Sequence, residues 1–233
     1  MPETIYTIPI NEVYEEIIES GRSVCPFCRL KNKLEEDELD IILGASMMEP
    51  DIRIKTNELG FCPDHFSKML RFAKRLPLAL ILESHLDQVN GNFKKKGLSK
   101  PSPEKIAEAI ENLSESCYVC SRIEYNEKRL ISNAVYMWQS DDEFKKKYRN
   151  AGYLCLPHAA RLLKAAKRDL GKKDWSSFSE ETVEIVGGNL SQIKEDVSTF
   201  VRSYDYRYAG EPLTEKEKTS VESSIRLLSG DKE

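Results

Sequence analysis

Apolar residues recur along most of the chain at intervals of three and four positions, the spacing of one face of an amphipathic helix. No series of alternating apolar and polar positions predicts a sheet. The helices predicted from this periodicity span residues 11–20, 29–43, 50–60, 66–76, 103–113, 123–139, 140–152, 159–170, 180–202 and 221–228. The predicted fold class is therefore all-α.

Local signals support several of these helix ends. Gly60 and Gly152 fit the left-handed position at which helices often stop. The segments Ser140–Glu143 and Thr214–Glu217 have the capping-box pattern that begins a helix. The pair Gly187-Gly188 predicts a weak point in the long helix over residues 180–202.

The cysteines and histidines follow a spacing that occurs twice. The segment Cys25-Pro-Phe-Cys28 is followed after 33 residues by Cys62-Pro-Asp-His65. Cys117-Tyr-Val-Cys120 is followed after 34 residues by Cys155-Leu-Pro-His158, so all six cysteines belong to the pattern. The second copy lies 92 to 93 residues after the first, and Lys68–Arg75 also resembles Arg161–Arg168. We interpret this as an internal duplication of two copies.

Three thiolates and one imidazole are a common ligand set for tetrahedral structural zinc, and four protein ligands leave no open coordination position for a substrate. An antiparallel helical hairpin in each copy would bring its two ligand pairs together. The sequence thus predicts one zinc site within each copy. The first would be formed by Cys25, Cys28, Cys62 and His65, and the second by Cys117, Cys120, Cys155 and His158.

Other chemistry remains open for the same residues. An iron–sulfur cluster can also take cysteine and histidine ligands. Cys-x-x-Cys alone is a thioredoxin-like redox motif, and six cysteines could form disulfides. Neither of the last two explains the repeated Cys-x-x-His. The third histidine, His85, has no counterpart in the second copy, and we expect it to be a partly exposed helix residue.

The duplication predicts four regions. Residues 1–92 would form the first metal-binding helical repeat, 93–102 a linker, 103–175 the second repeat and 176–233 a C-terminal helical region. The segment Tyr204–Tyr208 is dense in aromatic residues and is expected to pack a helix end on the core. Its Tyr204, Tyr206 and Arg207 are the alternative candidates for contact with a partner.

Composition restricts the function. The chain has 233 residues, a formal charge of −4 and a sequence pI of about 5.7, which argues against a general binder of nucleic acid or membrane surfaces. No stretch approaches about 18 apolar residues and no secretory signal is visible, so a cytoplasmic location is expected. The phosphate-binding, hydrolase and metalloprotease motifs that would indicate an enzyme are missing from the sequence. Enzymatic activity is left uncertain, and we lean against it.

The doubled layout resembles an uncharacterised family of bacterial cytoplasmic proteins, found mainly in anaerobic Firmicutes. Gly60-Phe-Cys-Pro-Asp-His65 and Gly152-Tyr-Leu-Cys-Leu-Pro-His158 carry the resemblance, which covers about residues 25–168. Asp205-Tyr-Arg207 is also similar to that family. The resemblance implies no known activity.

These observations favour a helical scaffold or interaction protein with two structural zinc ions, whose partner is another protein. The first alternative is a redox-responsive or iron–sulfur protein that uses the same ligands. The second is a zinc protein associated with nucleic acid through Lys94–Lys96, Lys145–Arg149 and the segment Tyr204–Tyr208.

Overall fold

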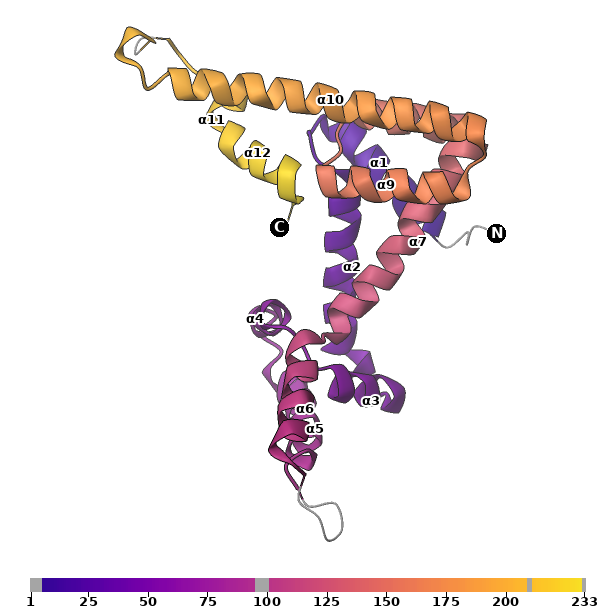
Figure 1. Ribbon diagram of the computed structural model, residues 1–233, viewed down its shortest axis with the longest axis vertical. Coiled ribbons are helices and arrows are strands. Elements are labelled where there is room, and N and C mark those ends of the chain that lie inside the picture. Colours follow the sequence, from indigo (N-terminus) through magenta and orange to yellow (C-terminus); the bar gives the residue numbers. More distant parts are fainter. Residues whose placement is uncertain (1–5, 95–100, 209–210, 232–233) are drawn as a thin grey trace. The chain divides into compact units, whose positions relative to one another are not determined.

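A computed structural model of the chain describes residues 6–94, 101–208 and 211–231. These residues form twelve α-helices and no strand, which confirms the all-α prediction (Figure 1). The helices are α1 (Thr7–Ser20), α2 (Pro26–Ile42), α3 (Pro50–Leu59), α4 (Pro63–Arg71), α5 (Arg75–Gly91), α6 (Pro103–Glu115), α7 (Tyr118–Ser140), α8 (Asp142–Ala151), α9 (Leu156–Asp169), α10 (Lys172–Arg202), α11 (Glu215–Lys218) and α12 (Ser220–Ser229). Short 3-10 helices span Ala45–Met48 and Tyr206–Tyr208. None of the described helices has the length and apolar character needed to cross a membrane.

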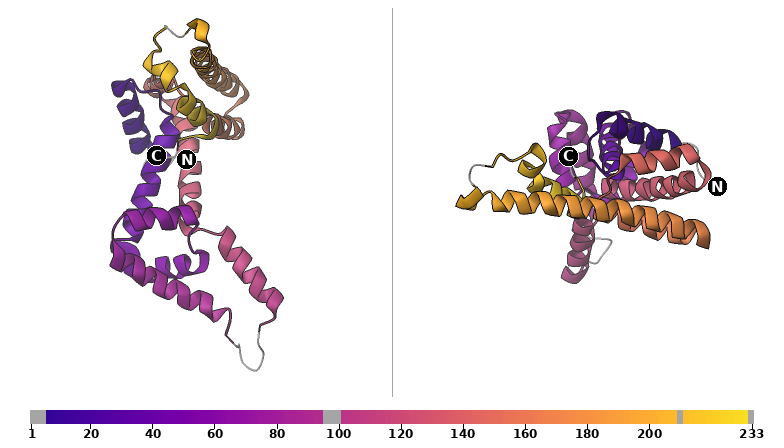
Figure 2. Two further views of the ribbon diagram at one scale, coloured as in Figure 1. Left: turned by 90° about the vertical axis from the view of Figure 1, so that its left-hand side faces the viewer. Right: turned by 90° about the horizontal axis from the view of Figure 1, so that it is seen from above.

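Most helix ends follow the local signals. Gly152 ends α8 in the left-handed αL conformation as predicted, whereas Gly60, after α3, has φ +59° but ψ −156° and lies outside αL. The capping box at Thr214 is present as predicted. Helix α8 is capped by Asp141 and not by Ser140, because the Asp141 carboxylate accepts hydrogen bonds from the backbone N–H groups of Glu143 and Phe144. Helix α10 continues unbroken through Gly187-Gly188 (Figure 2). Each glycine costs about 1 kcal/mol in a helix, and packing of α10 against α9 and α12 offsets that cost.

The chain divides into two compact units, which differ from the tandem division expected from the duplication. Unit 1 contains Met1–Asn32 and Glu127–Glu233, and unit 2 contains Lys33–Asn126. Both boundaries fall inside helices, one within α2 and the other within α7. Of the predicted linker 93–102, residues 95–100 lie outside the described part of the chain.

The core of unit 1 is aromatic. Tyr14 of α1 packs edge-on against Phe144 of α8, with ring centroids 5.0 Å apart. Phe178 of α10 makes the same kind of contact with Trp138 of α7 at 5.0 Å. The hydroxyl groups of Tyr148 and Thr182 are 2.8 Å apart in the same core, so α8 and α10 are also joined by a buried hydrogen bond.

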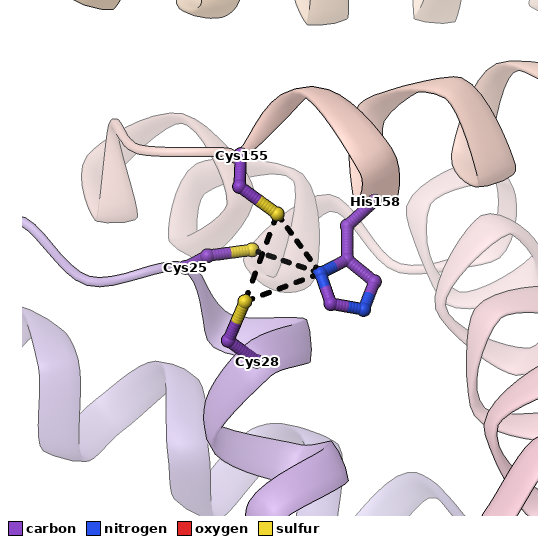
Figure 3. A group of neighbouring side chains, drawn as sticks. All are labelled: Cys25, Cys28, Cys155 and His158. Atoms are coloured by element: carbon purple, nitrogen blue, oxygen red, sulfur yellow. Dashed lines mark hydrogen bonds between the residues drawn. The ribbon is translucent and has the colours of Figure 1, made fainter. Parts of the chain in front are cut away.

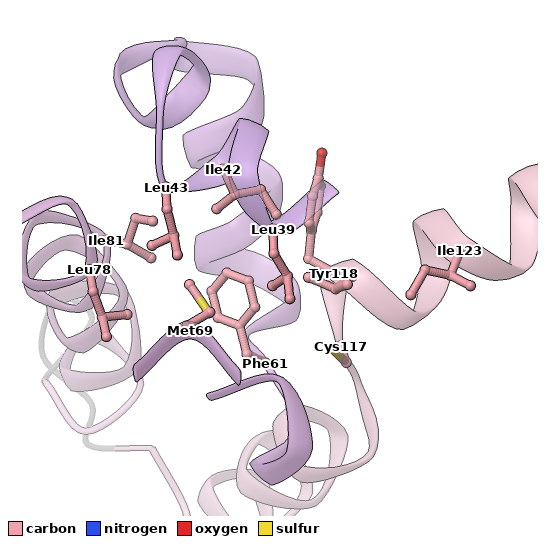
Figure 4. Close-up of a cluster of buried hydrophobic side chains, with 11 residues drawn as sticks. Leu39, Ile42, Leu43, Phe61, Met69, Leu78, Ile81, Cys117, Tyr118 and Ile123 are labelled. Atoms are coloured by element: carbon pink, nitrogen blue, oxygen red, sulfur yellow. The ribbon is translucent and has the colours of Figure 1, made fainter. Parts of the chain in front are cut away.

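Unit 2 has an aliphatic core formed by α2, α4, α5 and the beginning of α7 (Figure 4). The buried residues of this cluster are Leu39, Ile42, Leu43, Phe61, Met69, Leu78, Ile81, Cys117, Tyr118, Val119 and Ile123. Phe61 directly precedes the predicted ligand Cys62, and Cys117 is itself a predicted ligand. The core of unit 2 is therefore continuous with its cysteine cluster.

Candidate metal centres

The eight predicted ligand residues gather into two groups, each able to hold a metal ion, but not in the predicted combinations. Site A consists of Cys25, Cys28, Cys155 and His158 and lies in unit 1. Site B consists of Cys62, His65, Cys117 and Cys120 and lies in unit 2. Each Cys-x-x-Cys of one copy thus meets the Cys-x-x-His of the other copy. The predicted grouping within each copy is wrong.

Helix lengths explain why the ligands cross over. The predicted hairpin requires two helices of similar length, one running out and one running back. Helix α2 has 17 residues and spans about 25 Å, whereas α3 has 10 residues and spans about 15 Å. In the second copy α7 has 23 residues, about 35 Å, and α8 has 10, about 15 Å. The shorter helix does not return the chain to the cysteine pair from which it started.

Site A brings its four ligand atoms together from the beginnings of α2 and α9 (Figure 3). The Nδ1 atom of His158 is 3.0 Å from Cys155 Sγ, 3.3 Å from Cys28 Sγ and 3.6 Å from Cys25 Sγ. The sulfur atoms of Cys28 and Cys155 are 3.6 Å apart. All four residues are buried.

Site B has the same chemistry at the beginnings of α4 and α7. The Nδ1 atom of His65 is 3.0 Å from Cys62 Sγ, 3.2 Å from Cys117 Sγ and 3.5 Å from Cys120 Sγ. The sulfur atoms of Cys62 and Cys120 are 3.9 Å apart. His65 and Cys117 are buried, Cys62 is partly buried and Cys120 is exposed.

These distances fit a single tetrahedral ion. With Zn–S near 2.3 Å and Zn–N near 2.0–2.1 Å, a tetrahedron places two sulfurs about 3.8 Å apart and a sulfur and a nitrogen about 3.5 Å apart. The observed separations of 3.0 to 3.9 Å lie near these values in both sites. In a multinuclear iron–sulfur cluster the ligands bind different iron atoms and must stand farther apart. The separations between ligand atoms in both groups therefore suit one ion each.

Each site is assembled from two helix N-termini in the same way. One ligand immediately precedes its helix, and the other is the third helical residue, one turn further on. Two ligands at this spacing face the same side of the helix start. The partial positive charge of a helix N-terminus also favours thiolates over thiols. The spacing of two residues between ligands is thus explained by helix geometry.

The turn that precedes Cys62 is tied to the start of α7. Gly60 has φ +59°, which favours glycine. Its carbonyl accepts a hydrogen bond from the backbone N–H of Tyr118 at 3.0 Å. The Ser116 hydroxyl donates to the carbonyl of Leu59 at 2.7 Å. These bonds join both halves of site B independently of a metal ion.

The corresponding turn in unit 1 is held by Asn189 of α10. Its Nδ2 donates to the carbonyl of Gly152 at 2.9 Å, and its Oδ1 accepts from the backbone N–H of Leu154 at 3.2 Å. One side-chain amide therefore fixes both ends of the turn that leads into Cys155. The position of this side chain follows from the length of α10, so the motif alone could not predict it.

Each histidine is oriented by a carboxylate on the helix that begins at the Cys-x-x-Cys pair of the other site, and Glu127 is buried whereas Glu35 is half-buried. His158 Nε2–H donates to Glu127 Oε1 at 2.8 Å, and Arg161 pairs with the other oxygen of Glu127 at 2.7 Å. In site B, His65 Nε2–H donates to Glu35 Oε1 at 2.8 Å, and Lys68 pairs with the other oxygen. A carboxylate on Nε2 fixes the tautomer in which Nδ1 is free to bind a metal ion.

Ionisation of one thiol is assisted in each site, whereas burial raises the pKa of Cys25 and of Cys120. Hydrogen bonds from Cys25 and Cys28 lower the pKa of Cys155 to about 4. Burial opposes ionisation of Cys117, but its hydrogen bond with His65 lowers the pKa of this thiol to about 6. Hydrogen bonding from His65, reinforced by Lys68, lowers the pKa of Glu35 to about 2 against the opposing effect of burial. Each site thus holds a thiol that ionises readily, which metal binding requires.

His85 is buried, so the expectation of a partly exposed residue is wrong. Its Nδ1–H donates to the carbonyl of Asn57 at 3.0 Å, since a carbonyl can only accept. A Cβ atom at Gly60 would lie 3.0 Å from the His85 ring. The imidazole of His85 therefore packs beneath the turn that positions Cys62, and it is a structural support of site B.

The aromatic segment after α10 does not pack on the core as expected. Tyr204 is 79% exposed and Tyr206 is 87% exposed. Arg207 pairs with Asp205 at 2.6 Å and lies over the ring of Tyr208. The two exposed tyrosines remain candidates for contact with a partner.

The basic run over residues 145–149 is neutralised within unit 1. Its lysines and arginine pair with nearby carboxylates at 2.6 to 3.3 Å. The pairs are Lys145–Asp142, Lys146–Glu143, Lys147–Glu15 and Arg149–Glu181. The run is therefore a set of surface ion pairs, not a field of unpaired positive charge. Of the other predicted basic run, Lys95 and Lys96 lie outside the described residues.

Sequence reasoning missed the carboxylates Glu35 and Glu127, although a signal was present. Glu35 follows Cys25 by ten residues, and Glu127 follows Cys117 by ten. A basic residue also follows each ligand histidine by three positions. Comparing the two copies beyond their ligands would have identified all four of these charged residues.

Comparison with known proteins supports the family resemblance seen in the sequence. A family described as "Family of unknown function (DUF6062)" matches residues 1–233. The chain is similar to an "Uncharacterized 23.9 kDa protein in xynA 3'region" from Caldicellulosiruptor sp. (strain Rt8B.4), with 24% identity over 171 residues. That alignment covers 73% of this chain and 81% of the relative. No solved structure matches the chain.

Proposed function

The chain belongs to this family of unknown function, and we propose that it is a zinc-binding helical scaffold that presents its surface to another protein. One observation carries the proposal. Each unit contains a closed group of three thiols and one imidazole at the distances of a tetrahedral ion. Four protein ligands leave no coordination position for a substrate, so each ion has a structural role.

Zinc is supported over an iron–sulfur cluster by the size of the two sites. All ligand atoms within a group lie within 4.8 Å of one another, which suits a single ion. The carboxylate–histidine pairs at Glu35 and Glu127 are the outer contacts typical of zinc sites. The six cysteines form no disulfide, in keeping with a zinc protein of a reducing cytoplasm.

Each ion would join two helices that are distant in sequence. In site A it would connect the beginning of α2 to the beginning of α9, and in site B the beginning of α4 to that of α7. Structural zinc contributes about 10–16 kcal/mol of apparent binding free energy in small peptides, comparable to the whole stability of a domain. The scaffold is thus a metal-dependent one.

An interaction with protein is favoured over one with nucleic acid. The chain is acidic, and the basic run 145–149 is paired with carboxylates. The exposed Tyr204 and Tyr206 are of a residue type enriched at protein interfaces. Replacement of both tyrosines by serine should abolish capture of the partner protein while leaving zinc content and helicity intact.

Metal analysis tests the zinc assignment. Protein purified without air or chelator should contain about two zinc ions per chain, one for each four-ligand group, and no visible absorption bands. Removal of zinc should lower the helical circular dichroism signal, and its return should restore that signal. Iron with sulfide and a brown colour would contradict the proposal.

A further inference from the structure

The two sites have the same ligands but differ in access from solvent. In site A the four ligand side chains are all buried, and none is more than 5% exposed. In site B the Cys120 side chain is exposed and the Cys62 side chain is partly exposed. A small oxidant dissolved in water can therefore reach a ligand sulfur of site B directly.

Site A is covered by Gly230 and Asp231, which follow α12. The backbone N–H of Asp231 donates to Cys28 Sγ at 3.2 Å, across a sequence separation of 203 residues. Gly230 lies beside it, where an added Cβ would be 3.6 Å from Cys28 Sγ and 3.9 Å from Cys155 Sγ. Gly230 and Asp231 therefore block the approach of an oxidant to the sulfurs of Cys28 and Cys155. The hydrogen bond from Asp231 also withdraws electron density from the Cys28 sulfur.

Cys120 has no such protection. Its own backbone N–H donates to the neighbouring Cys117 Sγ at 3.5 Å. Within the described residues, no backbone N–H donates to Cys120 Sγ, whose contacts are with Cys62 Sγ and His65 Nδ1. Oxidation of a thiolate depends on its exposure, and a thiolate that accepts no backbone N–H hydrogen bond keeps more of its intrinsic nucleophilicity.

We propose that Cys120 is an oxidation site for hydroperoxides, and that its oxidation to a disulfide with Cys62 releases the ion of site B while site A keeps its own. This inference rests on the proposed zinc function. Cys62 is the partner because its sulfur is 3.9 Å from that of Cys120 and the residue is partly exposed, whereas Cys117 is buried.

The chemistry balances with hydrogen peroxide as the oxidant. The Cys120 thiolate attacks one peroxide oxygen, so an S–O bond forms, the O–O bond breaks and hydroxide leaves as water after protonation. The Cys62 thiolate then attacks the Cys120 sulfur, which forms the S–S bond and expels a second hydroxide that becomes water. Two thiolates supply the two electrons that reduce the peroxide. Only Cys117 and His65 then remain for the ion, and it dissociates.

Loss of this ion has a structural consequence limited to unit 2. The metal link between the beginnings of α4 and α7 is broken, whereas the hydrogen bond from Tyr118 to Gly60 remains. The new disulfide would join the same two helices in a different geometry. Oxidation would therefore reshape one unit, and a thiol reductant with zinc would reverse the change.

The experiment uses the full-length zinc protein. Zinc is counted first, which tests the proposed function separately, and hydrogen peroxide is then added in the presence of a chromogenic zinc indicator. We expect one of the two ions to be released in a fast phase and the other to be retained. Peptide mapping should find a disulfide between Cys62 and Cys120, with Cys25, Cys28 and Cys155 reduced.

Two matched variants show which site releases its zinc in the fast phase. Cys28→Ser should leave only site B occupied, and its remaining zinc should be released by peroxide. Cys62→Ser should leave only site A occupied, and its remaining zinc should resist. Release of both ions from the native protein at equal rates, earlier release from site A, or a disulfide that excludes Cys120 would overturn the inference. Peptide mapping of the native protein decides the matter even if either variant fails to fold.

Discussion

Glu127 lies on α7, the helix that begins at the site B cysteines, but it accepts a hydrogen bond from His158 of site A. Its replacement therefore tests how the two sites are built. Its side chain is 3% exposed and accepts the Nε2–H of His158 at 2.8 Å. Glu127→Ala would leave this buried N–H without an acceptor, at a cost of about 1–3 kcal/mol. Arg161 is partly exposed and can be resolvated by water, so its loss of a partner adds little.

The expected result is a weaker site A with an unchanged site B. Loss of an outer-shell partner typically lowers metal affinity by about 10–100-fold, or about 1.4–2.8 kcal/mol, which agrees with the cost of the unpaired N–H. Competition with a chromogenic zinc chelator measures the affinity, and alkylation mapping shows which cysteines lose their metal. Glu127→Gln retains an acceptor oxygen and should lose less.

Glu35→Ala is the matched control and should weaken site B by a similar factor, since Glu35 accepts from His65 at 2.8 Å. The reasoning is refuted if Glu127→Ala weakens the site that contains Cys117 and Cys120, its neighbours on α7. An unchanged zinc affinity at both sites would refute it equally.

Three further predictions concern the supports of the sites and the core. Asp231→Pro removes the N–H that donates to Cys28 and should speed loss of the site A ion to peroxide, whereas Asp231→Ala keeps the N–H and should not. Gly60→Ala forces a side chain into a left-handed position 3.0 Å from His85 and should lower the unfolding free energy of unit 2 by about 1–3 kcal/mol in thermal denaturation. Phe178→Ala removes a fully buried ring and should cost about 3–5 kcal/mol by chemical denaturation, with zinc content unchanged.

The sequence was sufficient to predict the fold class and to select the residues that cluster. Helical periodicity identified most of the helices, but it predicted one helix over residues 66–76, where α4 ends at Arg71 and α5 begins at Arg75. The capping box at Thr214 appears where its pattern placed it. The Cys-x-x-Cys and Cys-x-x-His spacings reflect local geometry at a helix start, so they could be recognised without knowledge of the tertiary fold. All eight cysteine and histidine residues selected in this way lie in the two clusters.

The combination of ligands could not be predicted, because two copies of one motif are chemically interchangeable. A Cys-x-x-Cys pair accepts the Cys-x-x-His of either copy, and the choice follows from the unequal lengths of α2 and α3 and of α7 and α8. Tertiary packing also overrode local signals at Gly187-Gly188, where α10 continues, and at His85, which is buried. The cover over Cys28 is formed by residues some 200 positions away, a contact that no local pattern contains.

The central claim, that each site is shared between the two copies of the motif, is tested most directly by counting zinc in two double variants. The variant Cys28→Ser with Cys155→Ser loses two ligands of site A and none of site B, so it should retain about one zinc ion per chain. Cys28→Ser with Cys62→Ser disables one ligand in each site, and this variant should retain none. The opposite result, no zinc in the first variant and one ion in the second, would show that each copy binds its own ion and would contradict the account.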